Sequence, residues 1–203
     1  MTENLMSATP DSNKAFISTW WGLFVLFTLG FPLFFMFKPT IDLENYGAIP
    51  PFELTDHQGK IYRSVDSQKP LVVNFIFTRC TNVCPLLSGK MQVLQEQTST
   101  KDVQLLSITV DPKYDTPSVL QQYSQRFENH YEHWKMLTGN ADQVREIVRS
   151  FQQTYEVEVA DPNAPSIMHS ERFVLIDSVG QIRGFFRSDN SSLNDLINAI
   201  DSL

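Results

Sequence analysis

The sequence contains two cysteines, Cys80 and Cys84, four positions apart. Residues 71–77, LVVNFIF, have the apolar, β-rich composition of a buried strand. Pro85 suits the first turn of a helix, and apolar residues at helical spacing follow it. Because the amide groups of a helix N-terminus stabilise anions, thiols placed there are expected to have lowered pKa values. The pair is therefore interpreted as reactive thiols that bind a soft metal or bond to each other, the alternative being two cysteines packed in a core.

A third ligand would complete the trigonal coordination that Cu(I) accepts, and a histidine would let the same site hold Cu(II). Of the four histidines, His57 is interpreted as a solvated turn residue, and His130 and His133 as part of a solvated helix face. His169 differs because it precedes a predicted strand, residues 172–176. A loop entering a strand beside the central one can lie at the sheet end where the first cysteine emerges. The residue pattern leaves His169 open between a metal ligand and a loop histidine without a task.

Composition excludes several classes of protein. The chain has 203 residues and a formal net charge of -7. This acidic balance argues against a general nucleic-acid binder, which needs a basic surface to meet phosphates. Two cysteines are too few for a disulfide-stapled small fold or for an all-cysteine zinc site.

A membrane anchor is predicted near the N-terminus. No charged residue lies between Lys14 and Lys38, and residues 15–37 are long enough to cross a bilayer as a helix. No small-x-small cleavage site follows, so the segment is expected to stay attached. The two flanking lysines leave the orientation open, while the acidic, arginine-free start favours a bacterial membrane protein. The predicted organisation is a tail (1–14), an anchor (15–37), a linker (38–51) and one domain (52–203).

Strands and helices alternate along the predicted domain. Expected strands cover residues 71–77, 103–110 and 134–137, hairpins lie around 56–59 and 177–180, and helices cover 118–127, 142–151 and 193–200. Thr116 is expected to cap the helix predicted at 118–127, and Pro117 to start it. The pattern predicts an α/β fold with helices packed on a mixed sheet.

Four segments together resemble the Sco/SenC family of copper-binding proteins. They are NFIFTRCTNVCPLL at 74–87, SITVDPKYDTP at 107–117, KMLTG at 135–139 and MHSERFVLIDSVG at 168–180. The ordered combination of CxxxCP, VDPxxDTP and a late His-Ser before a strand carries the resemblance. One departure is Thr81, where family members often have proline after the first cysteine.

The resemblance implies a thioredoxin-like fold of the peroxiredoxin and Sco type, with copper bound by Cys80, Cys84 and His169. It also implies a role in assembling the binuclear copper site of cytochrome c oxidase, on its subunit II, with a copper donor protein and a thiol reductant as further partners. The expected location is a bacterial inner membrane, with the domain in the periplasm. Asp111 and Asp115, in the second segment, are assigned a structural or docking role because turn formation and capping explain them.

Two rival functions use the same sulfurs. A thiol–disulfide oxidoreductase would cycle Cys80 and Cys84 between dithiol and disulfide, in which case both cysteines are catalytic. The CxxxC spacing differs from the CxxC of thioredoxin-like redox motifs, which favours a metallochaperone. A peroxiredoxin-like peroxidase would leave the second cysteine and His169 unexplained.

Overall fold

The computed structural model describes residues 43–152, 155–158, 166–169 and 171–203, which fall within one unit, Ile41–Leu203. Its main feature is a seven-stranded mixed sheet in the order β2-β1-β5-β4-β3-β8-β9. The strands are β1 (Glu53–Asp56), β2 (Ile61–Arg63), β3 (Leu71–Ile76), β4 (Gln104–Thr109), β5 (Trp134–Thr138), β8 (Arg172–Ile176) and β9 (Ile182–Arg187). The predicted α/β fold around a mixed sheet is confirmed.

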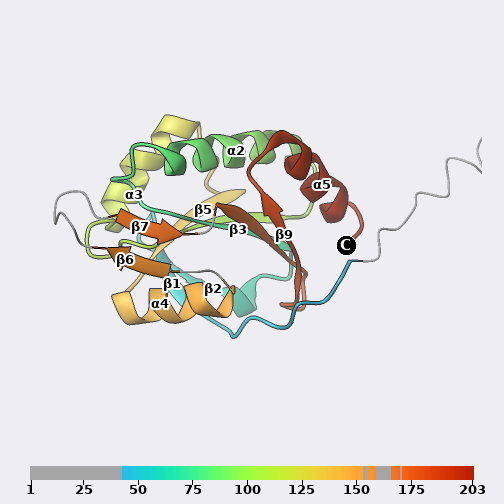
Figure 1. The fold of residues 1–203 in the computed structure, drawn as a ribbon, viewed down its shortest axis with the longest axis horizontal. Coiled ribbons are helices and arrows are strands. Elements are labelled where there is room, and N and C mark those ends of the chain that lie inside the picture. Colours follow the sequence, from blue (N-terminus) through green and yellow to red (C-terminus); the bar gives the residue numbers. More distant parts are fainter. Residues whose placement is uncertain (1–42, 153–154, 159–165, 170) are drawn as a thin grey trace, which may run out of the picture. The chain divides into compact units, whose positions relative to one another are not determined.

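Four α-helices are described: α2 (Val83–Gln97), α3 (Pro117–Ser124), α4 (Ala141–Ser150) and α5 (Asn190–Ile200). Helices α2 and α5 lie on one face of the sheet and α4 on the other (Figure 1). As predicted, Thr116 caps α3 by accepting a hydrogen bond from the Val119 N–H, and Pro117 is its first residue. A short 3₁₀ helix, η2 (Gln125–Phe127), replaces the expected end of α3, and another, η1 (Ser64–Asp66), follows β2.

The strand directions decide which loops meet. Strand β3 is parallel to β4, and β4 is parallel to β5. Strand β8 is antiparallel to β3, with Val73 opposite Val174. The segments that follow β3 and β4 and the segment that precedes β8 therefore lie at the same edge of the sheet. The cysteines and the 111–115 loop belong to the segments that follow β3 and β4.

The core is packed against both faces of the sheet. Every residue of β3 and β4 is buried, and in β3 this matches a nearly continuous apolar run, whereas β4 also buries the polar residues Gln104, Ser107 and Thr109. Phe151, beyond the end of α4, packs edge-on against Phe52 and Phe75, with ring centroids 6.1 and 5.5 Å away. Aromatic pairs in edge-on orientations stabilise a core by more than the apolar area that they bury. Strand β3, which leads into the cysteine loop, is thus packed on both faces.

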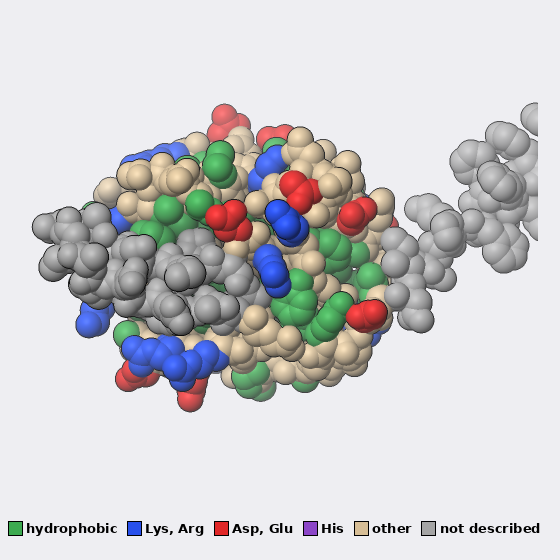
Figure 2. Space-filling model, viewed as in Figure 1, with side chains coloured by type: hydrophobic (Ala, Val, Ile, Leu, Met, Phe, Trp, Pro, Cys, Tyr) green, Lys and Arg blue, Asp and Glu red, His purple; other side chains and the backbone are tan. Residues whose placement is uncertain are grey.

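Charged side chains contribute less to this stability than the core. On the face shown in Figure 2, acidic and basic side chains are interspersed over the described surface. The ion pairs Arg187–Asp189 and Lys69–Asp102 join side chains that are largely in solvent. Such exposed pairs each contribute at most about 1 kcal/mol.

A second, two-stranded sheet was not predicted. Strands β6 (Tyr155–Glu158) and β7 (Ser166–His169) pair antiparallel, with His169 opposite Tyr155. Segments of four residues are too short to show a clear period in sequence, so residues 166–169 were expected to be a loop.

The predicted anchor, residues 15–37, lies outside the described residues, as do the tail and most of the linker. Within the described ranges, no helix has both the length and the apolar character needed to cross a bilayer. The division of the chain into tail, anchor, linker and domain stays a prediction.

Candidate metal centre

The two cysteines lie where β3 passes into α2. Cys80 belongs to the loop that follows Ile76, and Cys84 is the second residue of α2. Cys84 is completely buried, whereas Cys80 is partly exposed, and no disulfide joins the two. The predicted placement between a buried strand and a helix N-terminus is confirmed.

Hydrogen bonds connect both sulfur atoms to the backbone around them. The Cys84 N–H donates to the Cys80 Sγ at 3.5 Å, and the Phe77 N–H donates to the Cys84 Sγ at 3.4 Å. Asn82, in the N-cap position of α2, makes no capping hydrogen bond with its side chain. The Cys80 sulfur therefore takes over part of the capping role at this helix, and the two sulfurs share one site.

The two thiols have opposite pKa shifts. Burial by itself raises the pKa of Cys80, but hydrogen bonds from the Cys84, Asn82 and Val83 N–H groups outweigh it and lower that pKa below its usual value. Burial raises the pKa of the Cys84 thiol, and the negative charges of Cys80 and Asp115 raise it further. The sequence led us to expect a lowered pKa for both thiols. That expectation was wrong for Cys84, because its thiol is buried in the core although its backbone lies in the first turn of α2.

This difference predicts selective alkylation of the reduced, metal-free chain. Iodoacetamide should modify Cys80 more than about tenfold faster than Cys84, because the thiolate is the nucleophile and Cys84 is buried. As the pH falls, the Cys80 rate should persist below the range in which an ordinary thiol is deprotonated, since its pKa is lowered. Rates measured on Cys80→Ser and Cys84→Ser, each with one remaining thiol, check this. Equal rates for the two thiols would contradict it.

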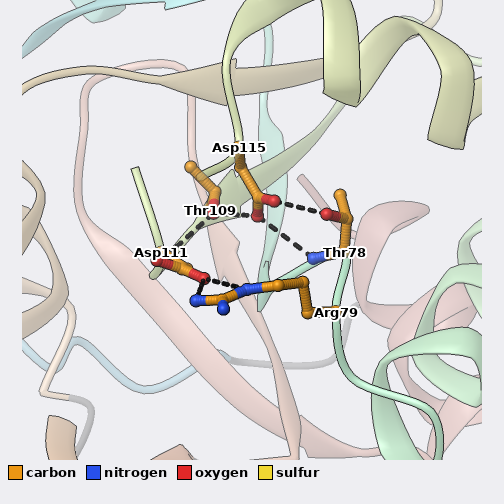
Figure 3. Close-up of polar contacts among 5 residues, drawn as sticks. All are labelled: Thr78, Arg79, Thr109, Asp111 and Asp115. Atoms are coloured by element: carbon orange, nitrogen blue, oxygen red, sulfur yellow. Dashed lines mark hydrogen bonds and ion pairs between the residues drawn. The ribbon is translucent and has the colours of Figure 1, made fainter. Parts of the chain in front are cut away.

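A buried carboxylate lies beside the cysteine loop (Figure 3). Asp115 is completely buried and accepts hydrogen bonds from the Thr78 N–H at 3.1 Å, from the Thr78 hydroxyl, and from the Thr109 hydroxyl at 2.5 Å. Burial raises the pKa of Asp115, and the hydrogen bonds from the two threonines oppose that rise. The carboxylate thus joins the end of β4 to the residue two positions before Cys80.

An ion pair joins the same two segments. The Arg79 guanidinium donates to Asp111 Oδ2 from its Nε at 3.0 Å and from a terminal nitrogen at 2.5 Å. The Arg79 guanidinium also lies over the Tyr114 ring, 4.6 Å from its centroid. The structural role assigned to Asp111 and Asp115 fits these contacts. Sequence reasoning missed Thr78, Arg79 and Thr109, and only their presence within the two family motifs marked them.

His169 is described by its backbone alone, at the end of β7. Arg172, where β8 begins, follows three residues later, and β8 starts at the sheet edge where β3 ends. Strand β8 therefore enters the sheet at the edge where the cysteine loop begins. Within the described residues, no group of three or more His, Cys, Asp or Glu side chains is arranged to hold a metal ion. The set of Cys80, Cys84 and His169 stays a prediction.

The interpretation of His57 as a solvated residue was wrong. His57 is buried, its Nδ1 accepts a hydrogen bond from the Met136 N–H at 3.0 Å, and its ring meets the Tyr131 ring edge-on. Burial lowers the pKa of His57. This histidine therefore joins the first hairpin to β5.

The solvated helix face predicted for the other two histidines is also incorrect. His130 and His133 lie in a turn, and His133 Nε2 is 3.0 Å from the Thr98 hydroxyl. The His130 ring stays exposed.

Known proteins share this architecture. A SCO2-like protein of Rickettsia felis is 34% identical over 145 residues, 69% of each chain. The solved structure of a SCO1/SenC family lipoprotein from Bacillus anthracis has a TM-score of 0.72 and 28% identity, over 80% of this chain and 97% of that one.

Two further solved structures are similar in fold. Copper-bound ScoI of Bradyrhizobium japonicum has a TM-score of 0.66 and 23% identity, over 76% of this chain and 97% of that one. BsSco, described as a cytochrome c oxidase assembly protein with a disulfide switch, has a TM-score of 0.68 and 24% identity, over 81% and 97%.

The predicted thioredoxin-like Sco fold is therefore confirmed. The family model described as SCO1/SenC matches residues 42–203, which contain both cysteines, the 111–115 loop and His169. On this match and on the relatives above, the chain belongs to the SCO1/SenC family.

Proposed function

We propose that this protein is a membrane-anchored copper metallochaperone that helps to assemble the binuclear copper site of cytochrome c oxidase. The observation that carries the proposal is the pair of sulfurs at the N-terminus of α2, where the Cys84 N–H donates to Cys80 Sγ. Two adjacent thiolates are the soft donors that Cu(I) prefers. Copper-bound and oxidase-assembly members of the family support the choice of metal and of pathway.

In this proposal Cys80, Cys84 and His169 hold the copper, which is cargo. The thiolates suit Cu(I), and the histidine extends the site to Cu(II). Cys80, partly exposed and with a lowered pKa, is the ligand that an acceptor's thiolate can reach first. The proposed partners are a copper donor, a thiol reductant and subunit II of the oxidase, and the proposed location is the periplasmic side of a bacterial inner membrane.

Copper titration of the full-length chain, reduced and solubilised in detergent without oxygen, tests the proposal. Competition with a chromophoric Cu(I) chelator should give one copper per chain. His169→Ala should weaken binding by more than about 10–100-fold, the loss typical when only a supporting group of a metal ligand is removed. His130→Ala is the matched control, because the His130 ring is exposed. A wild-type chain that binds no copper would refute the function, and a His169→Ala chain with wild-type affinity would refute the three-ligand site.

A second candidate function is thiol–disulfide exchange with the oxidase cysteines. The partly exposed Cys80, with its lowered pKa, lies beside the buried Cys84 and favours this function, since such a pair divides into an attacking thiol and a resolving thiol. Rapid reduction of a protein disulfide by the metal-free dithiol chain would favour this function over copper transfer. In that reaction one disulfide is reduced while Cys80 and Cys84 are oxidised to a disulfide, and the reductant partner restores the dithiol.

A further inference from the structure

The two sulfurs of the proposed site are held by different parts of the molecule. Cys84 belongs to α2, is buried in the core and accepts the Phe77 N–H. Cys80 belongs to the preceding loop, where its N–H donates to the Phe77 carbonyl oxygen at 3.2 Å. The position of Cys80 relative to Cys84 therefore depends on what fixes this loop.

The segment from Thr109 to Asp115 fixes it from the neighbouring strand. The two residues directly before Cys80 are Thr78 and Arg79. Thr78 donates both its N–H and its hydroxyl to Asp115, and Arg79 forms an ion pair with Asp111 (Figure 3). Both contacts join positions more than 30 residues apart, with sequence separations of 37 and 32.

The Asp115 contacts dominate because the group is inaccessible to water. A buried carboxylate is costly unless donors surround it, and here the three donors are the Thr78 N–H and the hydroxyls of Thr78 and Thr109. Releasing Thr78 would leave that carboxylate short of donors, so the loop is held strongly in place. The partly exposed Arg79–Asp111 pair is a weaker second contact.

We propose that Asp115 is a positioning residue that, through Thr78, holds the Cys80 loop so that the two sulfurs are preorganised for copper. The copper part of this inference rests on the proposed function, whereas the positioning part does not. Asp115 acts through hydrogen bonds to the loop and is not assigned as a ligand. Ligands held in place by such supporting groups bind their metal more tightly than unsupported ones.

The test compares Asp115→Asn with wild type in the full-length, reduced chain, with two readouts. Hydrogen–deuterium exchange of the metal-free chain should become faster in residues 77–82 while the core of β3 and β4 stays protected. Cu(I) affinity should fall about 10–100-fold, the range found when the supporting group of a metal ligand is lost. Asp195→Asn, which removes an exposed carboxylate from α5, is the matched control and should change neither.

A pair of threonine variants separates positioning from general destabilisation. Thr109→Ser keeps the hydroxyl that donates to Asp115 and should behave as wild type, whereas Thr109→Val should reproduce the effect of Asp115→Asn. Unchanged exchange in residues 77–82 of Asp115→Asn would overturn the inference, as would faster exchange with wild-type copper affinity. If wild type itself binds no copper, the proposed function fails, and the exchange measurements alone decide whether Asp115 positions the loop.

Discussion

Replacing Cys84 with serine should abolish high-affinity copper binding, with a loss of at least about 10³-fold, or about 4 kcal/mol. Cys84 supplies one of the two thiolates that the proposed site needs. A serine hydroxyl is a harder donor that stays protonated near neutral pH, so it cannot replace a thiolate toward Cu(I). The loss should exceed that of Asp115→Asn, since the latter variant keeps every ligand.

The fold should tolerate this replacement. The Cys84 Sγ accepts a hydrogen bond from the Phe77 N–H, and a serine Oγ is also an acceptor. The neighbouring Ser88, one turn along α2, shows that a buried hydroxyl is accommodated there when it has a partner, the Tyr123 hydroxyl at 3.0 Å. Weaker copper binding can therefore be separated from unfolding by recording circular dichroism on the same samples.

Thr81→Ala is the matched control for the cysteine variant. Thr81 lies between the two cysteines and is exposed, so its replacement alters the loop without removing a ligand. The same chelator competition should give wild-type affinity for Thr81→Ala. Retention of wild-type affinity by Cys84→Ser would exclude Cys84 as a ligand.

The largest effect on stability is expected from Trp134→Ala, which should lower the free energy of unfolding by about 3–5 kcal/mol. Domains of this kind are stable by only about 5–15 kcal/mol, so the loss is a large fraction of the total. Trp134 is among the largest fully buried side chains, and its removal leaves a cavity between the sheet and the chain around Phe127, whose ring centroid lies 6.4 Å away.

A hydrogen-bonded chain through the sheet adds to this cost. The Trp134 Nε1–H donates to the Ser107 hydroxyl at 2.9 Å, and that hydroxyl donates to Asn74 Oδ1 at 2.6 Å. The three side chains come from β5, β4 and β3 and are all completely buried. Losing the indole removes one donor from a buried network, which typically costs about 1–3 kcal/mol.

Urea unfolding of Trp134→Ala and Trp134→Phe separates the two contributions. Phenylalanine keeps most of the apolar volume but not the N–H, so Trp134→Phe should lose the smaller amount, about 1–3 kcal/mol. A loss for Trp134→Ala no greater than that for Trp134→Phe would show that the ring's packing contributes little. The slope of the unfolding free energy against urea concentration should be the same in both variants, because a changed slope would mean that unfolding exposes a different amount of surface.

The sequence by itself determined the local structure of this protein. The apolar run at 71–77, the Thr116–Pro117 helix start and the Asp177–Gly180 hairpin turn each depend on neighbouring residues, and each lies where it was predicted. The cysteine spacing at a strand-to-helix junction and the ordered motifs identified the family and the two thiols. These features are readable because capping, turns and periodicity depend on residues only a few positions apart.

The tertiary structure alone decided which distant groups meet. Asp115 reaches Thr78 across 37 residues, and His57 reaches Met136 across 79, so neither partner is visible in a local pattern. The different pKa shifts of the two thiols likewise depend on burial, which follows from how α2 packs on the sheet. Side-chain environment is set by strand order and packing, and these place a residue among neighbours that its own segment does not specify.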